Sequence, residues 1–152
     1  MDHHTHHHDS SWRTATSATL HCLTGCAIGE VLGMVLATWW GWGDAASIAL
    51  AVVLAFFFGY LLTIWSVRNA GLGLGGMVRV ALAADTVSIA VMEFVDNGVL
   101  LAVPDAMDSG LADWLFWGAL GFALAVAFVV TLPVNRWMIS RGVGHAAVHA
   151  YH

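Results

Sequence analysis

Residues 21–33 read HCLTGCAIGEVLG, and this stretch decides how the first apolar segment of the chain must pack. Three glycines recur at every fourth position: Gly25, Gly29 and Gly33. At about 100° per residue, Cys22, Cys26 and Glu30 form one stripe along a helix, and the glycines form a second stripe beside it. Polar groups avoid lipid and small residues allow close helix packing, so we expect this broad face to contact protein.

The composition of the chain predicts a membrane protein. Of its 152 residues, 59% are hydrophobic and only 10% are charged. A soluble domain of this size could not bury so much apolar surface, because small proteins leave a large part of their chain exposed to water. The net charge of −5 and the absence of lysine argue against nucleic acid as a partner. We therefore predict one domain whose main partner is the lipid bilayer.

Four apolar stretches have the length of a membrane-spanning helix, about 20 residues. They cover residues 18–40, 45–66, 80–102 and 114–134. Their apolar runs are too continuous for the alternating strands of a barrel, and helices satisfy their own backbone in lipid. The predicted fold is all-α, an integral membrane four-helix bundle over residues 18–140. We expect Pro133 to kink or end the last helix.

The arginines predict how the bundle is oriented. All five lie before the first stretch, between the second and third stretches, or after the fourth. The other two connections carry aspartates instead. Because cytoplasmic loops are rich in arginine and lysine, we predict that both termini are cytoplasmic. The predicted location is the bacterial inner membrane, in a multi-pass arrangement.

Both ends of the chain contain histidines. Residues 1–17 are predicted to form a His-rich cytoplasmic tail, disordered because it is polar, and residues 141–152 a second tail with His145, His149 and His152. Histidine-rich tracts are a compositional sign of metal binding.

The third apolar stretch contains carboxylates of its own. Residues 84–97 read ADTVSIAVMEFVDN and include Asp85, Glu93 and Asp96. An aspartate near the centre of a spanning helix costs about 2.5–3.5 kcal/mol on insertion scales. Such residues normally face the interior of a bundle or a water-filled cavity. We expect this helix to turn its acids toward the other helices.

The first and third helices run in the same direction, so the depths of their polar residues can be compared. Cys22 and Cys26 should lie near Asp85, and Glu30 should lie near Glu93. If the two helices touch, a layer of thiols is followed by a layer of carboxylates. Neighbouring carboxylates in a low dielectric cannot all ionise, so at least one should hold a proton or a cation.

These patterns give three sets of candidate residues. The candidate metal ligands are His21, Cys22, Cys26 and Met92. The candidate ion or proton pathway consists of Glu30, Asp85, Glu93 and Asp96, and the helix-packing residues are Gly25, Gly29 and Gly33. Packing alone explains many buried cysteines and methionines, and Asp96 would also suit a cap near the outer side. We do not predict an enzyme, because the membrane region has no nucleophile–base pair or nucleotide fingerprint.

Three stretches of the sequence resemble a known family. HCLTGCAIGEVLG, ADTVSIAVMEFVDN and LPVNRWMISRGVGHA (residues 132–146) are similar to the bacterial membrane proteins grouped as domain of unknown function forty-three ninety-six. The resemblance extends from Thr19 to His145. It implies no established activity, but it implies an association with copper-handling proteins. The residues on which this implication falls are His21, Cys22, Cys26, Glu30, Asp85, Met92 and Glu93.

The function predicted from these observations is binding or conduction of a transition metal through the face shared by the first and third helices. Cysteine and methionine favour copper as the cofactor or cargo, and the carboxylates and histidine would also suit zinc. One alternative is a proton or cation channel that uses the carboxylates. Another is an accessory subunit of a larger membrane complex.

The glycine stripe has two candidate partners, the third helix of the same chain or the first helix of another copy. Because both polar helices must avoid lipid, we predict a homo-oligomer, most simply a dimer with the first helices near its axis.

Overall fold

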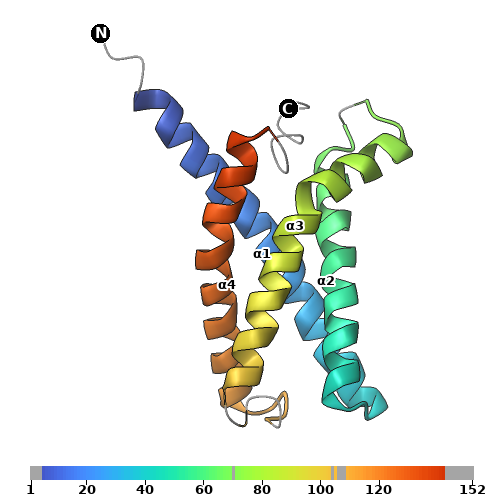
Figure 1. Cartoon of the computed structure of the whole chain (residues 1–152). Coiled ribbons are helices and arrows are strands. Elements are labelled where there is room, and N and C mark those ends of the chain that lie inside the picture. The colour runs from blue at the N-terminus through green and yellow to red at the C-terminus, as the bar shows by residue number, and fades with distance from the viewer. Residues whose placement is uncertain (1–4, 70, 104, 106–108, 143–152) are drawn as a thin grey trace.

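The computed structural model describes residues 5–69, 71–103, 105 and 109–142. Within these residues the chain forms four helices and no strand, which confirms the predicted all-α fold. They are α1 (Thr5–Trp40), α2 (Asp44–Ser66), α3 (Leu74–Ala102) and α4 (Trp114–Ser140). The start of α1, the α2–α3 connection and the end of α4 lie at the same end of the bundle (Figure 1), and we call this the arginine end. The opposite end, with the α1–α2 and α3–α4 connections, is the aspartate end.

Helix α1 is longer than predicted, since it begins at Thr5 rather than at residue 18. Residues 5–17, predicted to be part of a disordered tail, therefore continue the helix, and residues 1–4 lie outside the described part of the chain. A helix that has already nucleated gains further turns at little cost. The extension also has a tertiary contact, because the guanidinium of Arg136 in α4 lies 3.9 Å from the ring centroid of Trp12.

Two further helices are also longer at the arginine end than the apolar stretches predicted. Helix α3 begins at Leu74 rather than at residue 80, and α4 continues to Ser140 rather than stopping at 134. Pro133 lies inside α4 and does not end it. A proline removes one backbone hydrogen bond, and membrane bundles tolerate this because neighbouring groups satisfy the freed carbonyl. Of the predicted C-terminal tail, residues 143–152 lie outside the described residues.

The bundle has the polarity of a membrane protein, with apolar side chains outside and polar side chains inside. Within the described chain, three helices are apolar and long enough to cross a membrane: α1 from Trp12, α2 and α4. Helix α3 is not one of these three, and it is the helix that carries buried acids. It nevertheless turns Phe94 and Leu101 outward, and its 29 residues exceed the roughly 20 that a span requires. The chain is thus a helical membrane protein.

The glycine stripe of α1 packs against α2 of the same chain. The three glycines Gly25, Gly29 and Gly33 face, in that order, Gly59, Ala55 and Ala51. A Cβ atom at Gly29 would lie 2.2 Å from the backbone nitrogen of Ala55. The predicted packing role is confirmed, but the predicted partner, α3 or a second α1, is wrong. The reason is that α2 has small residues at every fourth position, and two such stripes let backbones approach closely. The homodimer remains a prediction, but the glycine stripe no longer supports it.

Candidate functional site

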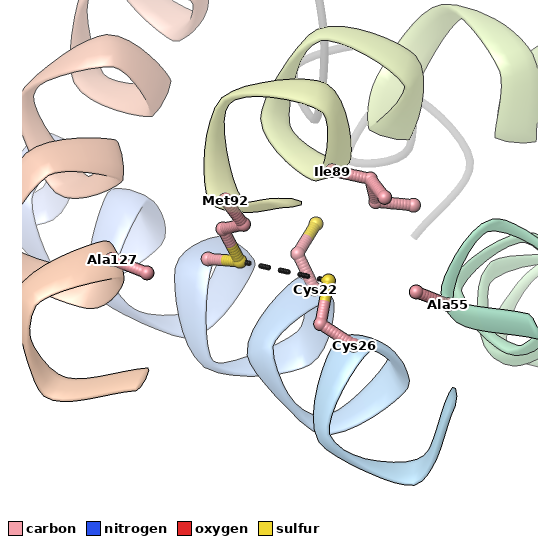
Figure 2. Close-up of a cluster of buried hydrophobic side chains, with 6 residues drawn as sticks. All are labelled: Cys22, Cys26, Ala55, Ile89, Met92 and Ala127. Carbon is pink, nitrogen blue, oxygen red and sulfur yellow. Dashed lines mark hydrogen bonds between the residues drawn. The ribbon is translucent and has the colours of Figure 1, made fainter. Parts of the chain in front are cut away.

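The polar stripe of α1 meets α3, as the depth comparison predicted. The Sγ atom of Cys22 lies 3.7 Å from Oδ1 of Asp85. One turn further along α1, Sγ of Cys26 lies 4.0 Å from Sδ of Met92. Figure 2 shows the two cysteines on α1 and Met92 reaching them from α3. We call Cys22, Cys26 and Met92 the sulfur layer.

The sulfur layer is enclosed by apolar side chains from the other helices. Ala55 of α2, Ile89 of α3 and Ala127 of α4 close around it, and all three are fully buried (Figure 2). Both cysteines are free thiols that water does not reach, with exposed fractions of 0% and 1%. The layer therefore offers soft ligands in a dry environment.

A second layer follows toward the aspartate end and contains the acids Glu30, Glu93 and Asp96, which we call the carboxylate layer. Glu30 and Asp96 are only 4% and 2% exposed. Among the described residues, no hydrogen-bond donor reaches either carboxyl oxygen of Glu30 or of Asp96. Glu93 accepts one hydrogen bond from Nδ2 of Asn97 at 3.2 Å, while its other oxygen has no partner in the described chain. Burial of carboxyl groups without partners is costly, so this layer needs a proton or another ligand.

The position of Asp96 decides between its two predicted roles. A cap or an outward-reaching side chain would be exposed, whereas Asp96 is buried and close to Glu30. Its neighbour Asn97 instead donates to the backbone oxygen of Glu93 at 2.9 Å. Asp96 therefore belongs to the carboxylate layer and does not cap the helix.

The side chain of the predicted ligand His21 contacts α2. Its Nε2 atom is 2.9 Å from Oγ1 of Thr63 in α2, and Thr63 in turn forms a side-chain hydrogen bond with Asp85. His21 also lines an open groove at the arginine end together with Trp65, Arg68 and Asn69. His21 therefore links this groove, through Thr63, to Asp85, the acid beside Cys22.

One buried polar network was not predicted from the sequence. Asn135 of α4 accepts a hydrogen bond from Ser88 of α3 and donates one to Oγ1 of Thr19 in α1 at 2.9 Å. All three side chains are buried. The apolar stretch of the last helix stops at residue 134, so the hydropathy pattern places Asn135 just beyond the spanning part of that helix. The signal in the sequence that could have predicted this network is an amide side chain one helical turn after Thr131.

The described residues contain no group of three histidine, cysteine, aspartate or glutamate side chains arranged to hold a metal ion. The histidines at positions 145, 149 and 152 lie outside the described part of the chain. A metal ion in the bundle would therefore depend on the sulfur layer, with two thiols and one thioether as ligands.

The family described as domain of unknown function (DUF4396) matches residues 11–144. The chain belongs to this family. The match with DUF4396 includes the sulfur layer, the carboxylate layer and the Asn135 network, and it confirms the resemblance seen in the sequence. No curated protein and no solved structure matches the chain. DUF4396 has no assigned activity, so a function has to be argued from these sites.

Proposed function

We propose that the chain binds a soft metal ion, Cu(I), in the sulfur layer between α1 and α3, in the bacterial inner membrane. The observation that carries this proposal is the 4.0 Å approach of Cys26 Sγ to Met92 Sδ, with Cys22 one turn away. Thiolate and thioether ligands select Cu(I), whereas carboxylates and imidazole suit Zn(II) better. Zinc is the alternative metal because Asp85 lies beside Cys22.

The distance between Cys26 Sγ and Met92 Sδ suits a shared ion. Metal–sulfur bonds of about 2.3 Å place two ligands of one ion at most about 4.6 Å apart. The distance between Cys26 Sγ and Met92 Sδ is inside this limit. Little rearrangement would be needed for both sulfur atoms to bind one ion, and Cys22 could add a third bond.

The order of polar groups along the bundle favours passage as well as binding. The groove at the arginine end leads through His21 and Thr63 to Asp85 and Cys22. The carboxylate layer follows on the other side of the sulfur layer, with Glu93 beside Cys26. An ion that moved along the α1–α3 face would meet a ligand at each step.

Copper binding can be measured by titrating the full chain in detergent with Cu(I) against a competing chelator, under reducing conditions. The terminal histidines would compete, so they are replaced by asparagine at His3, His4, His6, His7, His8, His145, His149 and His152. We expect one Cu(I) per chain, and at least tenfold weaker binding in Cys26→Ser and in Met92→Leu. The matched control is Met34→Leu, which removes a thioether outside the sulfur layer. Full affinity in the Cys22→Ser/Cys26→Ser variant would refute the proposal.

A second candidate, a proton or cation pathway, is favoured by the partnerless carboxyl oxygens of Glu30 and Asp96. Here the acids carry the ion and the sulfur atoms only fill space. Flux into liposomes separates the two candidates. Under the second candidate, Glu30→Gln abolishes proton or cation flux and Cys22→Ser leaves it intact. The reverse pattern would favour the metal.

A further inference from the structure

The carboxyl groups of Glu30 in α1 and Asp96 in α3 face each other inside the bundle, within interaction distance. Both side chains are more than nine-tenths buried. In the part of the chain that the structure describes, all four of their oxygens lack a hydrogen-bond donor. Two negative charges in this position would repel each other and would have lost their water.

Among the described residues, the surroundings of the pair offer no positive charge. On α3 the facing titratable group is Glu93, which adds a further acid, and on α1 it is the thiol of Cys26. The arginines of the same two helices, Arg13 and Arg79, are each about 25 Å away along the helix axis, at 1.5 Å per residue.

The other two helices contribute apolar side chains next to Glu30. They are Ile48 and Ala51 from α2, and Phe116 and Leu120 from α4. Since the described part of the chain places no cation beside the acids, we expect the group that neutralises the pair to come from solvent.

A small cavity lies beside Glu30 on the side of the aspartate end. It measures about 20 Å³, and Glu30 lines it together with Asn97 and Met34. A cavity of this size has room for about one water molecule, and its wall is almost entirely apolar. The remaining lining residues belong to the halves of the helices that approach the aspartate end. The cavity therefore extends from Glu30 toward that end of the bundle.

We propose that Glu30 and Asp96 form a proton-binding site, in which the two carboxyl groups share one proton. The protonated acid donates its O–H to the carboxylate of the other, so the proton supplies the missing donor and removes one charge. The inference deepens the proposed carboxylate pathway, but it holds whether or not the chain conducts ions. The carboxyl groups of Glu30 and Asp96 are not among the proposed copper ligands, so the inference does not depend on copper binding.

Infrared spectroscopy of the full chain in lipid vesicles tests the site directly. We expect a C=O stretching band of a protonated carboxyl group at neutral pH, and this band should shift when water is replaced by D2O. Glu30→Gln and Asp96→Asn should each shift or remove the same band, because the proton is shared. Asp85→Asn is the matched control. Asp85 is a buried acid beside Cys22 and outside the carboxylate layer, so this substitution should leave the band in place.

Two outcomes would overturn the proposal. One is a wild-type spectrum in which no carboxyl band is sensitive to D2O, a result that requires no variant to fold. The other is a band that disappears when Na⁺ is added at constant pH, which would mean that a metal cation and not a proton neutralises the pair. The experiment measures proton binding and not ion flux. If the chain shows the band but no flux in liposomes, the proton-binding site is supported and only the proposed pathway is refuted.

Discussion

Gly29 of α1 lies against Ala55 of α2 so closely that a Cβ at position 29 would come within 2.4 Å of the Ala55 Cα atom. The contact explains why α1 can serve two neighbours. The glycine stripe is offset from the cysteine stripe by about 60° on the helix, so one meets α2 while the other meets α3. The close α1–α2 contact thus leaves the cysteine stripe of α1 facing α3.

Replacement of Gly29 by alanine should destabilise the bundle. The added methyl group would meet backbone atoms that cannot move without separating the helices, and overpacking of this kind costs about 1–3 kcal/mol. We expect a lower midpoint of thermal unfolding in detergent, followed by circular dichroism.

Gly118→Ala in α4 is the matched control for this substitution. No atom of the described residues lies within 4 Å of the Cβ position at Gly118, and alanine in a helix is favoured over glycine by about 0.5–1 kcal/mol. The control should be neutral or stabilising. If Gly29→Ala retained its stability and only lowered the mass of an oligomer, the stripe would pack against a second copy.

Asn135→Ala should weaken the packing of α4 on α1 and α3. The substitution removes the hydrogen bonds to Ser88 and Thr19, and hydrogen bonds between membrane helices contribute about 0.6–1.7 kcal/mol each. Unfolding of the single variants and of Asn135→Ala/Ser88→Ala should show that the two losses are not additive. Asn69→Ala, at an exposed position, should change stability by less than about 0.5 kcal/mol. Additive losses would mean that the two side chains do not interact.

The thiols of Cys22 and Cys26 should be unreactive in the folded protein. Both lie inside the bundle, so a maleimide should modify them only after denaturation, as measured by intact mass. A Ser17→Cys variant in a background without the native cysteines should react at once, since Ser17 is exposed. Rapid modification of the native thiols would show that water enters the sulfur layer.

A membrane-impermeant maleimide applied to intact cells should report the orientation. In a cysteine-free background, Asp44→Cys at the aspartate end should react, and Arg141→Cys at the arginine end should not. Both positions are exposed, so burial cannot account for the difference. Labelling of Arg141→Cys alone would reverse the predicted orientation.

The apolar stretches predicted the number and order of the helices, because each must cover the hydrocarbon core. They did not predict the helical ends at the arginine end. Beyond the membrane a helix needs no apolar residues, so residues 5–17 of α1 and 135–140 of α4 gave no hydropathy signal. For the same reason, hydropathy did not place Asn135 in the last helix, whereas the structure places it inside the bundle.

The sequence by itself determined that Cys22, Cys26 and Glu30 share one face of a helix and that this face avoids lipid. The angle per residue sets the first result, and the cost of a carboxylate in hydrocarbon sets the second. Only the tertiary structure decided that this face meets Met92 and Asp96 of α3, and that the glycines meet α2. The periodicity of one helix fixes the direction of its side chains, but the neighbour in that direction depends on how all four helices pack together.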